Sequence, residues 1–202
     1  MKIGLLGTGQ IGKKNARTLA AAGHDVKVAN SRGPDTIPAD VLETGARAVT
    51  QSEALTDIGV AILSVPPTAF EALRELVSTL PEYGVLIDTS NYYPGRDGAI
   101  AAIEAGQIEA EWVREQLGRP MVKAWNAIGS DSFSRKGRKA GEPGRIAIPV
   151  AGERQRDREI AIKLVDDSGF DGFDAGTLET AWRQQPGAPA YCTDLTLEEM
   201  GP

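Results

Sequence analysis

The sequence has few of the residues that build disulfides, metal sites and nucleic-acid surfaces. It contains one cysteine and one histidine in 202 residues, so an internal disulfide framework and a cysteine-type zinc site are both excluded. Aromatic residues make up 5% of the chain, and 28 acidic residues against 22 basic ones give a net charge of −6. Nucleic-acid-binding proteins usually carry a clustered basic surface, so we expect no nucleic acid among the partners.

Long hydrophobic runs are also missing from the sequence. No apolar segment approaches the roughly 20 residues of a membrane-spanning helix, and the first predicted strand begins at Lys2, which leaves no room for a signal peptide. Hydrophobic residues nevertheless make up 41% of the chain, enough to build one good core. We therefore expect a cytoplasmic globular protein that does not associate with membranes.

A glycine-rich turn near the N-terminus is the strongest functional signal. An apolar strand is predicted over residues 2–6 and a helix over residues 13–22, and between them stands a G-x-G-x-x-G motif, which in this context indicates dinucleotide binding. The predicted cofactor-binding residues of this turn are Gly7, Thr8, Gly9, Gln10, Ile11 and Gly12. Gly7 permits the turn, Gly9 lets the backbone approach a pyrophosphate, and Gly12 lets the helix pack close to the strand. The diphosphate would lie at the N-terminus of the helix, where free N–H groups favour an anion.

The end of the second predicted strand indicates which dinucleotide is preferred. Enzymes that use NAD place an acidic residue there to hold the ribose 2′-hydroxyl, whereas this chain has Asn30, Ser31 and Arg32. A hydroxyl and a planar guanidinium are suited to bind a 2′-phosphate. We therefore predict NADP(H) as the cofactor, while an ordinary polar turn remains the alternative.

The alternation of strands and helices predicts an α/β fold with a doubly wound parallel sheet, the Rossmann NAD(P)-binding fold. We predict a dinucleotide-binding domain over residues 1–128. Residues 129–202 should form a small C-terminal extension, consisting of strand, helix, strand and tail, that packs on the same core. Within it, the basic stretch 130–145 is polar and lacks hydrophobic periodicity, so we predict a loop that either covers the site or is simply solvated.

Ligands of such sheets bind beyond the carboxyl ends of the strands. At the end of the apolar run 60–65, Ser64, Val65 and Pro66 should lie along the cofactor toward its nicotinamide. The polar stretch 88–98 follows the next strand, and within it we select Asn91 and Tyr92 for the acceptor site. The alternative is a turn whose side chains cap the next helix.

Groups able to act as a general acid are scarce. His24 is predicted at the opposite end of the sheet, Lys123 stands near the start of a strand predicted over residues 121–125, and Cys192 is expected to be buried. Tyr92 and Tyr93 are the remaining candidates. Because carbonyl reduction needs a tuned proton donor, whereas hydride exchange between two ring systems mainly needs proximity, this scarcity favours cofactor-to-cofactor transfer.

Taken together, the glycine motif, the Ser31–Arg32 pair, the run 60–67 and the strand Val122-Lys123-Ala124-Trp125-Asn126 resemble the NADP oxidoreductase family typified by the F420-dependent NADP reductase. The resemblance implies that Thr8, Ser31 and Arg32 hold NADPH. It also implies that the Asn126 region lines the site of a second cofactor or substrate, coenzyme F420 or a flavin, and on this ground we place Asn126 with the predicted catalytic residues. Family members often carry another basic residue after the Ser-Arg pair, where this chain has Gly33, Pro34 and Asp35.

Three functions remain open at this level. The first is hydride transfer between NADPH and a deazaflavin or another small-molecule acceptor. The second is a small NADPH-dependent dehydrogenase or imine reductase, although such enzymes add a large helical domain. The third is a non-catalytic NADP(H) redox sensor. The apolar tail, with Trp182 and Tyr191, also leads us to expect a homodimer.

Overall fold

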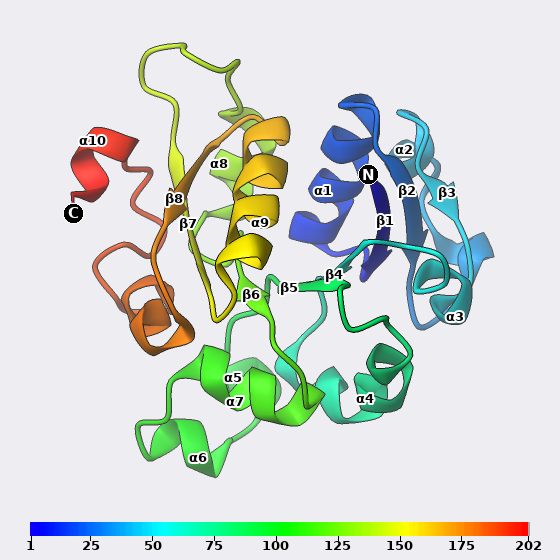
Figure 1. Cartoon of the computed structure of the whole chain (residues 1–202), viewed down its shortest axis with the longest axis horizontal. Helices are drawn as coiled ribbons and strands as arrows, with labels where there is room; N and C mark the ends of the chain where they lie inside the picture. The colour runs from blue at the N-terminus through cyan, green and yellow to red at the C-terminus, as the bar shows by residue number, and fades with distance from the viewer. Residues whose placement is uncertain (202) are drawn as a thin grey trace.

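The structure is a computed structural model that describes residues 1–201. Its framework is one eight-stranded sheet with the order β3-β2-β1-β4-β5-β6-β7-β8 (Figure 1). The strands are β1 (Lys2–Leu6), β2 (Asp25–Ala29), β3 (Arg47–Ala48), β4 (Val60–Leu63), β5 (Val85–Asp88), β6 (Val122–Lys123), β7 (Ala147–Gly152) and β8 (Asp171–Asp174). All neighbouring pairs are parallel except β6 and β7, which are antiparallel. The predicted doubly wound α/β sheet is therefore confirmed, with one reversal near its C-terminal edge.

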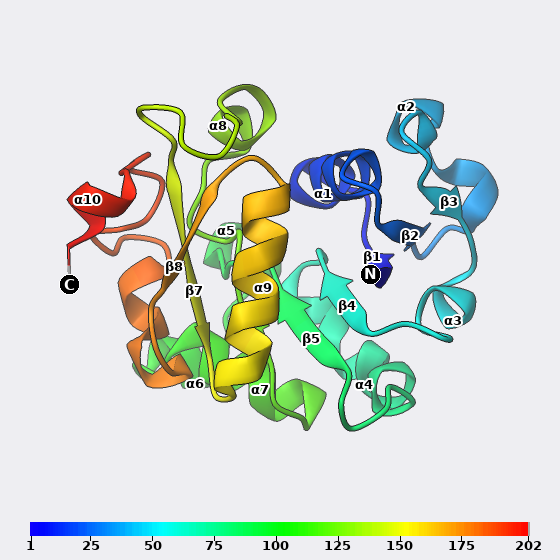
Figure 2. The same cartoon turned by 45° about the horizontal axis from the view of Figure 1, so that its top comes forward.

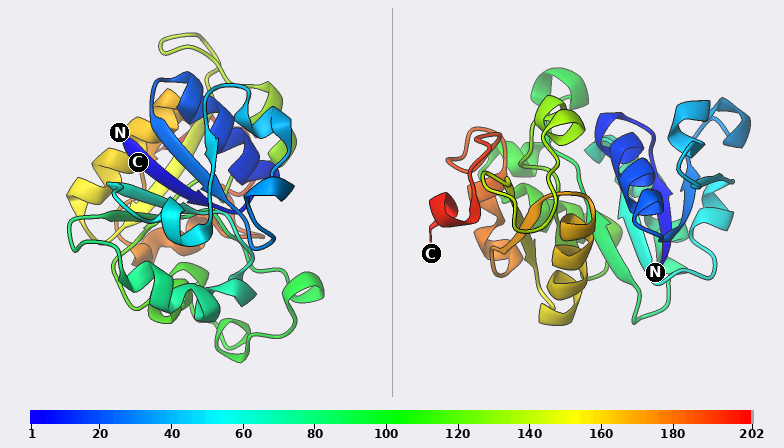
Figure 3. Two further views of the ribbon diagram at one scale, coloured as in Figure 1. Left: turned by 90° about the vertical axis from the view of Figure 1, so that its right-hand side faces the viewer. Right: turned by 90° about the horizontal axis from the view of Figure 1, so that it is seen from above.

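Helices cover both faces of the sheet. The α-helices are α1 (Gln10–Ala21), α2 (Ala39–Leu42), α3 (Gln51–Ala54), α4 (Phe70–Ser78), α5 (Pro94–Asp97), α6 (Ala101–Glu104), α7 (Glu109–Leu117), α8 (Ser130–Arg135), α9 (Gln155–Asp167) and α10 (Leu197–Met200). Short 3-10 helices are η1 (Pro34–Thr36), η2 (Pro67–Ala69) and η3 (Leu178–Gln184). In Figure 2, α9 passes in front of the sheet beside α1, and the left view of Figure 3 places α4 and its green neighbours on the opposite side.

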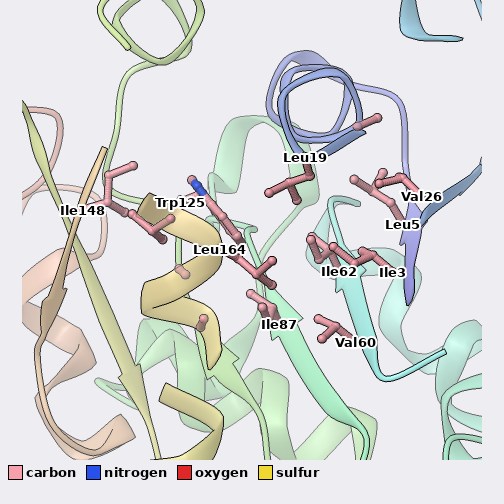
Figure 4. Packing of buried hydrophobic residues seen from close by; sticks show 14 of the residues in the cluster. Ile3, Leu5, Leu19, Val26, Val60, Ile62, Ile87, Trp125, Ile148 and Leu164 are labelled. Carbon is pink, nitrogen blue, oxygen red and sulfur yellow. The ribbon is translucent and has the colours of Figure 1, made fainter. Parts of the chain in front are cut away.

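Alternating side chains on each strand produce two hydrophobic clusters, one for each face. Leu5 and Ile62 belong to the cluster packed against α1 and α9, whereas their neighbours Leu6 and Leu63 belong to the cluster packed against α4 and α7. Figure 4 shows the first cluster, in which Leu164 of α9 lies close to Ile87 of the sheet. Burial on both faces explains why the central strands read as continuous apolar runs.

The C-terminal part of the chain extends this sheet and shares its core. Ile148 of β7 and Leu164 of α9 belong to the same cluster as Leu5, so side chains from both predicted segments pack together. The division of the chain at residue 128 stays a prediction.

Two local expectations are corrected by the structure. The stretch predicted as a loop after Gly129 begins with helix α8, whose Phe133 is fully buried and packs against Phe170 with ring centroids 5.2 Å apart. A single buried aromatic anchors this helix, which explains why no repeating apolar pattern was visible. The predicted strand 121–125 is shortened to Val122–Lys123, because Trp125 adopts a positive φ of 59° and leaves the extended conformation.

Candidate functional site

The glycine turn brings the backbone of β1, α1 and β4 into close contact. Gly7 has a φ of 103°, and a Cβ atom there would lie 2.1 Å from the carbonyl oxygen of Ser64. A Cβ on Gly12 would lie 2.1 Å from the carbonyl oxygen of Gly7, so this position also requires glycine. A Cβ on Gly9, by contrast, would meet no atom within 4 Å. Gly9 therefore faces open space at the start of α1, where the N–H groups of the first turn lack a side-chain cap.

Two adjoining cavities lie at the carboxyl ends of the strands. They share Gly9, Ser64, Val65 and Pro66, so they form one crevice. The first, which we call the glycine-loop cavity, has a volume of about 540 Å³ and is lined by Gly7, Thr8, Gly9, Asn30, Ser31, Arg32, Gln51, Ser64, Val65, Pro66, Ala69, Ala72 and Leu73. The second, the tyrosine cavity, has a volume of about 450 Å³ and is lined by Gly9, Gln10, Ile11, Ser64, Val65, Pro66, Thr89, Ser90, Asn91, Tyr93, Arg96, Trp125, Asn126, Ile128, Gly129, Ser130, Tyr191 and Cys192. Both volumes fall within the range of ligand pockets.

The structure brings together all the predicted cofactor-binding residues except Gly12 in the lining of this crevice. Gly12 is buried behind the turn and acts through packing. Asn30 lines the glycine-loop cavity, but its side chain is only 8% exposed and is engaged within the turn. Its Oδ1 accepts a hydrogen bond from the Arg32 backbone N–H at 2.8 Å, and its Nδ2 lies 3.0 Å from the Thr36 hydroxyl. Asn30 therefore shapes the turn that presents the exposed residues Ser31 and Arg32.

An amide network forms one wall of the tyrosine cavity. The Asn91 Nδ2 group donates to the Asn126 carbonyl oxygen at 2.8 Å, and the Asn126 Nδ2 group donates to Asn91 Oδ1 at 3.1 Å. Asn126 also donates to the carbonyl oxygen of Gln184 at 2.9 Å and accepts from Gln184 Nε2 at 2.9 Å. Both N–H groups of the Asn126 amide are thus used internally. Asn91 and Asn126 both line the tyrosine cavity, and their bonding suits them to position its wall.

Two tyrosine hydroxyls meet above this wall. The hydroxyl groups of Tyr93 and Tyr191 are hydrogen-bonded to each other, and Asn91 Nδ2 lies 3.5 Å from the Tyr191 oxygen. Arg96 stacks on the Tyr93 ring, with its guanidinium carbon 4.9 Å from the ring centroid. Burial raises the pKa of Tyr191, so this hydroxyl stays protonated at neutral pH. Because one hydroxyl of a bonded pair uses its proton on the other, one O–H donor of the pair remains available to a ligand.

Tyr92 does not reach the tyrosine cavity, so its selection for the acceptor site is corrected. Its side chain is 6% exposed, and its hydroxyl donates to Glu104 at 2.6 Å and accepts from the Ile100 backbone N–H at 3.1 Å. The hydrogen bond to Glu104 raises the Tyr92 pKa, which makes the hydroxyl a weaker acid. In extended backbone, neighbouring side chains point to opposite sides, and it is Tyr93 that lines the cavity.

A buried ion pair that the sequence did not reveal joins the ends of β5 and β6. Lys123 Nζ is 2.5 Å from Asp88 Oδ2, and the two side chains are 2% and 0% exposed. Asp88 also accepts hydrogen bonds from the backbone N–H and the hydroxyl of Ser90, at 2.9 and 3.1 Å. Strands β5 and β6 are neighbours, so their ends place these opposite charges side by side. The pair fixes the start of the segment that carries Asn91 and Tyr93.

Of the two remaining candidates, His24 and Cys192, only Cys192 lines the crevice. His24 lies outside the lining of both cavities, and its ring nitrogens bond to Asp167 at 3.0 Å and to the N-terminal amino group at 2.9 Å. Cys192 is exposed and lines the tyrosine cavity, which corrects the expectation that it is buried. Its backbone N–H donates to the Ala127 carbonyl oxygen at 2.7 Å, and partial burial raises the pKa of its thiol.

Metal-binding clusters and membrane-spanning helices are both missing from residues 1–201. Within that part, no group of three or more histidine, cysteine and acidic side chains could hold a metal ion. None of the helices found there has the length and apolar character needed to cross a membrane.

Comparison with known proteins identifies relatives of this chain. A family model described as NADP oxidoreductase coenzyme F420-dependent matches residues 2–92. Protein YjhV of Escherichia coli (strain K12) is 43% identical over 60 residues, which represent 30% of this chain and 44% of that relative. The alignment therefore spans less than half the length of the curated relative.

Solved structures extend the similarity to the whole fold. A hypothetical protein, SMa0349 from Sinorhizobium meliloti, is 25% identical, with a TM-score of 0.80 over 97% of this chain and 95% of that chain. A structure from Arthrobacter sp. FB24 described as a "putative f420 dependent nadp-reductase" is 21% identical, with a TM-score of 0.70 over 90% of this chain and 87% of that one. An imine reductase from Bacillus cereus, at 18% identity and a TM-score of 0.58, covers 90% of this chain but only 56% of its own. These similarities show the shared fold.

The family match and the glycine turn agree on the same part of the molecule. Residues 2–92 contain the turn, the Ser31–Arg32 pair and the Ser64–Pro66 segment, which together line the glycine-loop cavity. This agreement makes the glycine-loop cavity the candidate site for a dinucleotide. The resemblance to the family described as NADP oxidoreductase coenzyme F420-dependent therefore covers residues 2–92 and the cavity that they line.

Proposed function

We propose that this protein transfers hydride between NADPH and a small acceptor, a deazaflavin or another flavin-like ring, bound in the tyrosine cavity. One observation carries the proposal: the glycine-loop cavity and the tyrosine cavity share Gly9, Ser64, Val65 and Pro66. A dinucleotide held by the glycine turn would extend past these residues, so its reacting end would adjoin the second cavity. Hydride transfer requires little more than this close approach of the nicotinamide carbon to the accepting atom of the ring.

The residues of the glycine-loop cavity fit a dinucleotide phosphate. The open space at Gly9 allows a pyrophosphate to approach the backbone, and the uncapped first turn of α1 offers N–H donors. Ser31 and Arg32, presented by the Asn30 turn, would hold the 2′-phosphate. When bound, NADPH supplies the hydride.

The acceptor would be oriented by the tyrosine pair. Asn91 and Asn126 hold the cavity wall, and the free O–H of the Tyr93–Tyr191 pair would donate to an oxygen or nitrogen of the acceptor. The lining includes no histidine or lysine, and the raised pKa values of Tyr191 and Cys192 make both groups weak acids. A site of this kind favours an acceptor whose ring stabilises the added electrons over a carbonyl that must be protonated.

The proposal is tested by mixing the protein with NADPH, and separately with NADH, and then adding coenzyme F420, FMN or a panel of carbonyl compounds. Loss of the reduced nicotinamide absorbance reports turnover. Rapid oxidation with F420 or FMN but not with carbonyls is the expected result. Oxidation with carbonyls alone would favour a small dehydrogenase or imine reductase, and tight NADPH binding without any turnover would favour a redox sensor.

Matched tyrosine variants separate a role in the cavity from a structural one. Tyr93→Phe removes a hydroxyl that faces the cavity and should lower kcat, whereas Tyr92→Phe removes one bonded to Glu104 and should leave kcat much less affected. Equal effects of the two variants would contradict the proposed role of the tyrosine pair.

We also propose that the protein forms a homodimer through its C-terminal tail. Trp182 and Leu197, two large apolar side chains near the C-terminus, are 47% and 45% exposed and would be covered in such a dimer. Light scattering coupled to size exclusion should report twice the mass of the chain, and Trp182→Ser should shift the mass toward the monomer. A monomeric wild-type protein would contradict this proposal.

A further inference from the structure

The buried ion pair of Lys123 and Asp88 reaches the tyrosine cavity through one hydroxyl group, that of Ser90. Ser90 is 7% exposed and lines the cavity, whereas Lys123 and Asp88 lie outside its lining. The Ser90 Oγ atom is 3.1 Å from Asp88 Oδ2 and 3.4 Å from Lys123 Nζ. A ligand in the cavity would therefore meet the ion pair only through Ser90.

The two charged partners of Ser90 fix the direction of its proton. A carboxylate can only accept hydrogen bonds, and an ammonium group can only donate them. The Ser90 hydroxyl therefore donates to Asp88 and accepts from Lys123. The Ser90 backbone N–H donates to Asp88 Oδ1 at 2.9 Å, which holds the residue against the carboxylate. A hydroxyl has one proton and two lone pairs, so a single lone pair of Ser90 is left for the cavity.

Other hydroxyl contacts in the same lining have no fixed direction. The hydroxyl oxygens of Thr89 and Ser64 lie 3.0 Å apart, and those of Tyr93 and Tyr191 are bonded to each other. Each of these neutral groups can donate or accept, so both pairs can reverse to suit a ligand. Ser90 cannot reverse in this way, because its proton would then point toward an ammonium group. It is a fixed hydrogen-bond acceptor.

Ser90 stands in sequence between the two regions that the proposed reaction uses. On one side its neighbour Thr89 is bonded to Ser64, which lines both cavities. On the other side its neighbour Asn91 has its Nδ2 atom 3.5 Å from the Tyr191 oxygen. The fixed acceptor is therefore placed between the expected nicotinamide end and the tyrosine pair, which offers an O–H donor. A ligand that meets both groups must accept one hydrogen bond and donate another.

We propose that Ser90 binds a ring N–H of the acceptor, and that Lys123 and Asp88 are positioning residues that keep the Ser90 proton turned away from the ligand. The inference rests on the proposed function and narrows its acceptor to a flavin-like ring with an unsubstituted imide, in which an N–H stands beside a carbonyl. The carbonyl would accept from the tyrosine pair, and the N–H would donate to Ser90. A ring methylated at that nitrogen would leave the Ser90 lone pair without a partner, which weakens binding.

Lumiflavin and 3-methyllumiflavin differ only at the imide nitrogen, so they serve as the probes. Each is titrated into the full-length protein with NADP⁺ present, and quenching of the flavin fluorescence reports binding without turnover. We expect lumiflavin to bind about tenfold more tightly, because the methylated ring loses one hydrogen bond and leaves an acceptor unpaired. Ser90→Ala should remove most of this preference.

Ser132 provides a matched control outside both cavities. Its hydroxyl donates to Asp194 Oδ2 at 2.7 Å, and Lys136 Nζ donates to the same oxygen at 2.7 Å. The group thus repeats the arrangement of serine, aspartate and lysine found at Ser90. Ser132→Ala should leave the preference for lumiflavin unchanged.

A second variant separates the ion pair from the serine. Lys123→Met combined with Asp88→Asn keeps the Ser90 hydroxyl but removes both charges. An amide can donate or accept, so the hydroxyl is then free to reverse, and the preference for lumiflavin should fall although Ser90 is present. A preference kept in this double variant would refute the positioning role of the ion pair. This variant also tests the inference if Ser90→Ala fails to fold.

The outcomes distinguish this inference from the proposed function. Equal affinity of the wild type for the two rings, failure of both to bind, or a preference that survives Ser90→Ala would overturn the role of Ser90. If lumiflavin is preferred as expected but NADPH reduces no acceptor, the proposed function fails and the role of Ser90 stands. If NADPH reduces both rings with equal KM, the proposed function stands and the role of Ser90 is refuted.

Discussion

Replacing Lys123 with methionine should lower the free energy of unfolding by about 3–5 kcal/mol, the usual cost of breaking a buried ion pair. The structural basis is the 2.5 Å contact between Lys123 Nζ and Asp88 Oδ2, with side chains that are 2% and 0% exposed. Methionine is similar in length and apolar, so the packing is largely kept while Asp88 loses its counter-charge. The two hydrogen bonds from Ser90 compensate the carboxylate only in part, which keeps the predicted loss large.

Urea unfolding followed by tryptophan fluorescence measures the change, because Trp125 is fully buried in the native state. The double variant Lys123→Met with Asp88→Asn removes both charges and should regain a large part of the loss, since no isolated buried charge remains. Lys2→Met is the matched control: its partner Asp57 is 75% exposed, so this variant should change stability far less.

The reasoning would be refuted in either of two ways. A loss below about 1 kcal/mol for Lys123→Met would mean that water reaches the pair and screens it. A double variant no more stable than the single one would mean that the lysine contributes through its packing, and that its charge contributes little.

Four further variants examine the crevice and its support. Arg32→Glu should weaken NADPH binding far more than NADH binding in a fluorescence titration, because a carboxylate would repel the 2′-phosphate; an equal loss for both would contradict the NADP assignment. Gly9→Ala should leave the Tm unchanged but lower NADPH affinity at least tenfold, because the added Cβ meets no protein atom. Gly12→Ala should lower the Tm, because its Cβ would meet the backbone. The reverse pattern would contradict these roles of the two glycines. Burial raises the pKa of Glu109 above its ordinary value of 4.5, so the stability that its protonated form contributes is present at low pH and is lost as the pH rises through the raised pKa. Glu109→Gln should therefore flatten the decline of the Tm above pH 4.5, and a decline as steep as that of the wild type would argue against this role.

Much of the fold and the first half of the site could be predicted because their determinants are local in sequence. The glycine turn lies between a strand and a helix within 20 residues, where Gly7 and Gly12 avoid backbone clashes and Gly9 faces open space, as the motif implies. The turn at Asn30 is equally local, since its side chain bonds within six residues. The alternation of apolar runs and amphipathic segments was enough to predict the sheet.

The second half of the site depends on contacts that sequence spacing does not reveal. Tyr191 reaches Tyr93 across 98 positions, and Gln184 reaches Asn126 across 58. Whether Tyr92 or Tyr93 faces the cavity depends on which side of an extended segment is turned toward it. A register shift of one residue would exchange the two side chains, and the sequence does not fix this register. Helix α8 was missed because one buried residue, Phe133, anchors it and no periodic pattern marks it.

Trp125 links the stability of the core to the shape of the tyrosine cavity. A bulky residue with a φ of 59° is strained by an amount on the order of 1–3 kcal/mol, and such strain persists only where the surroundings hold it. Here the indole is fully buried in the cluster that includes α9, and its N–H lies 3.3 Å from the Ser168 hydroxyl just after that helix. Because the strained residue directly precedes Asn126, its backbone sets the direction in which the Asn126 amide meets Asn91 and Gln184. The packing of α9 on the sheet therefore maintains the backbone conformation of Trp125. That conformation in turn positions the Asn126 amide in the wall of the tyrosine cavity.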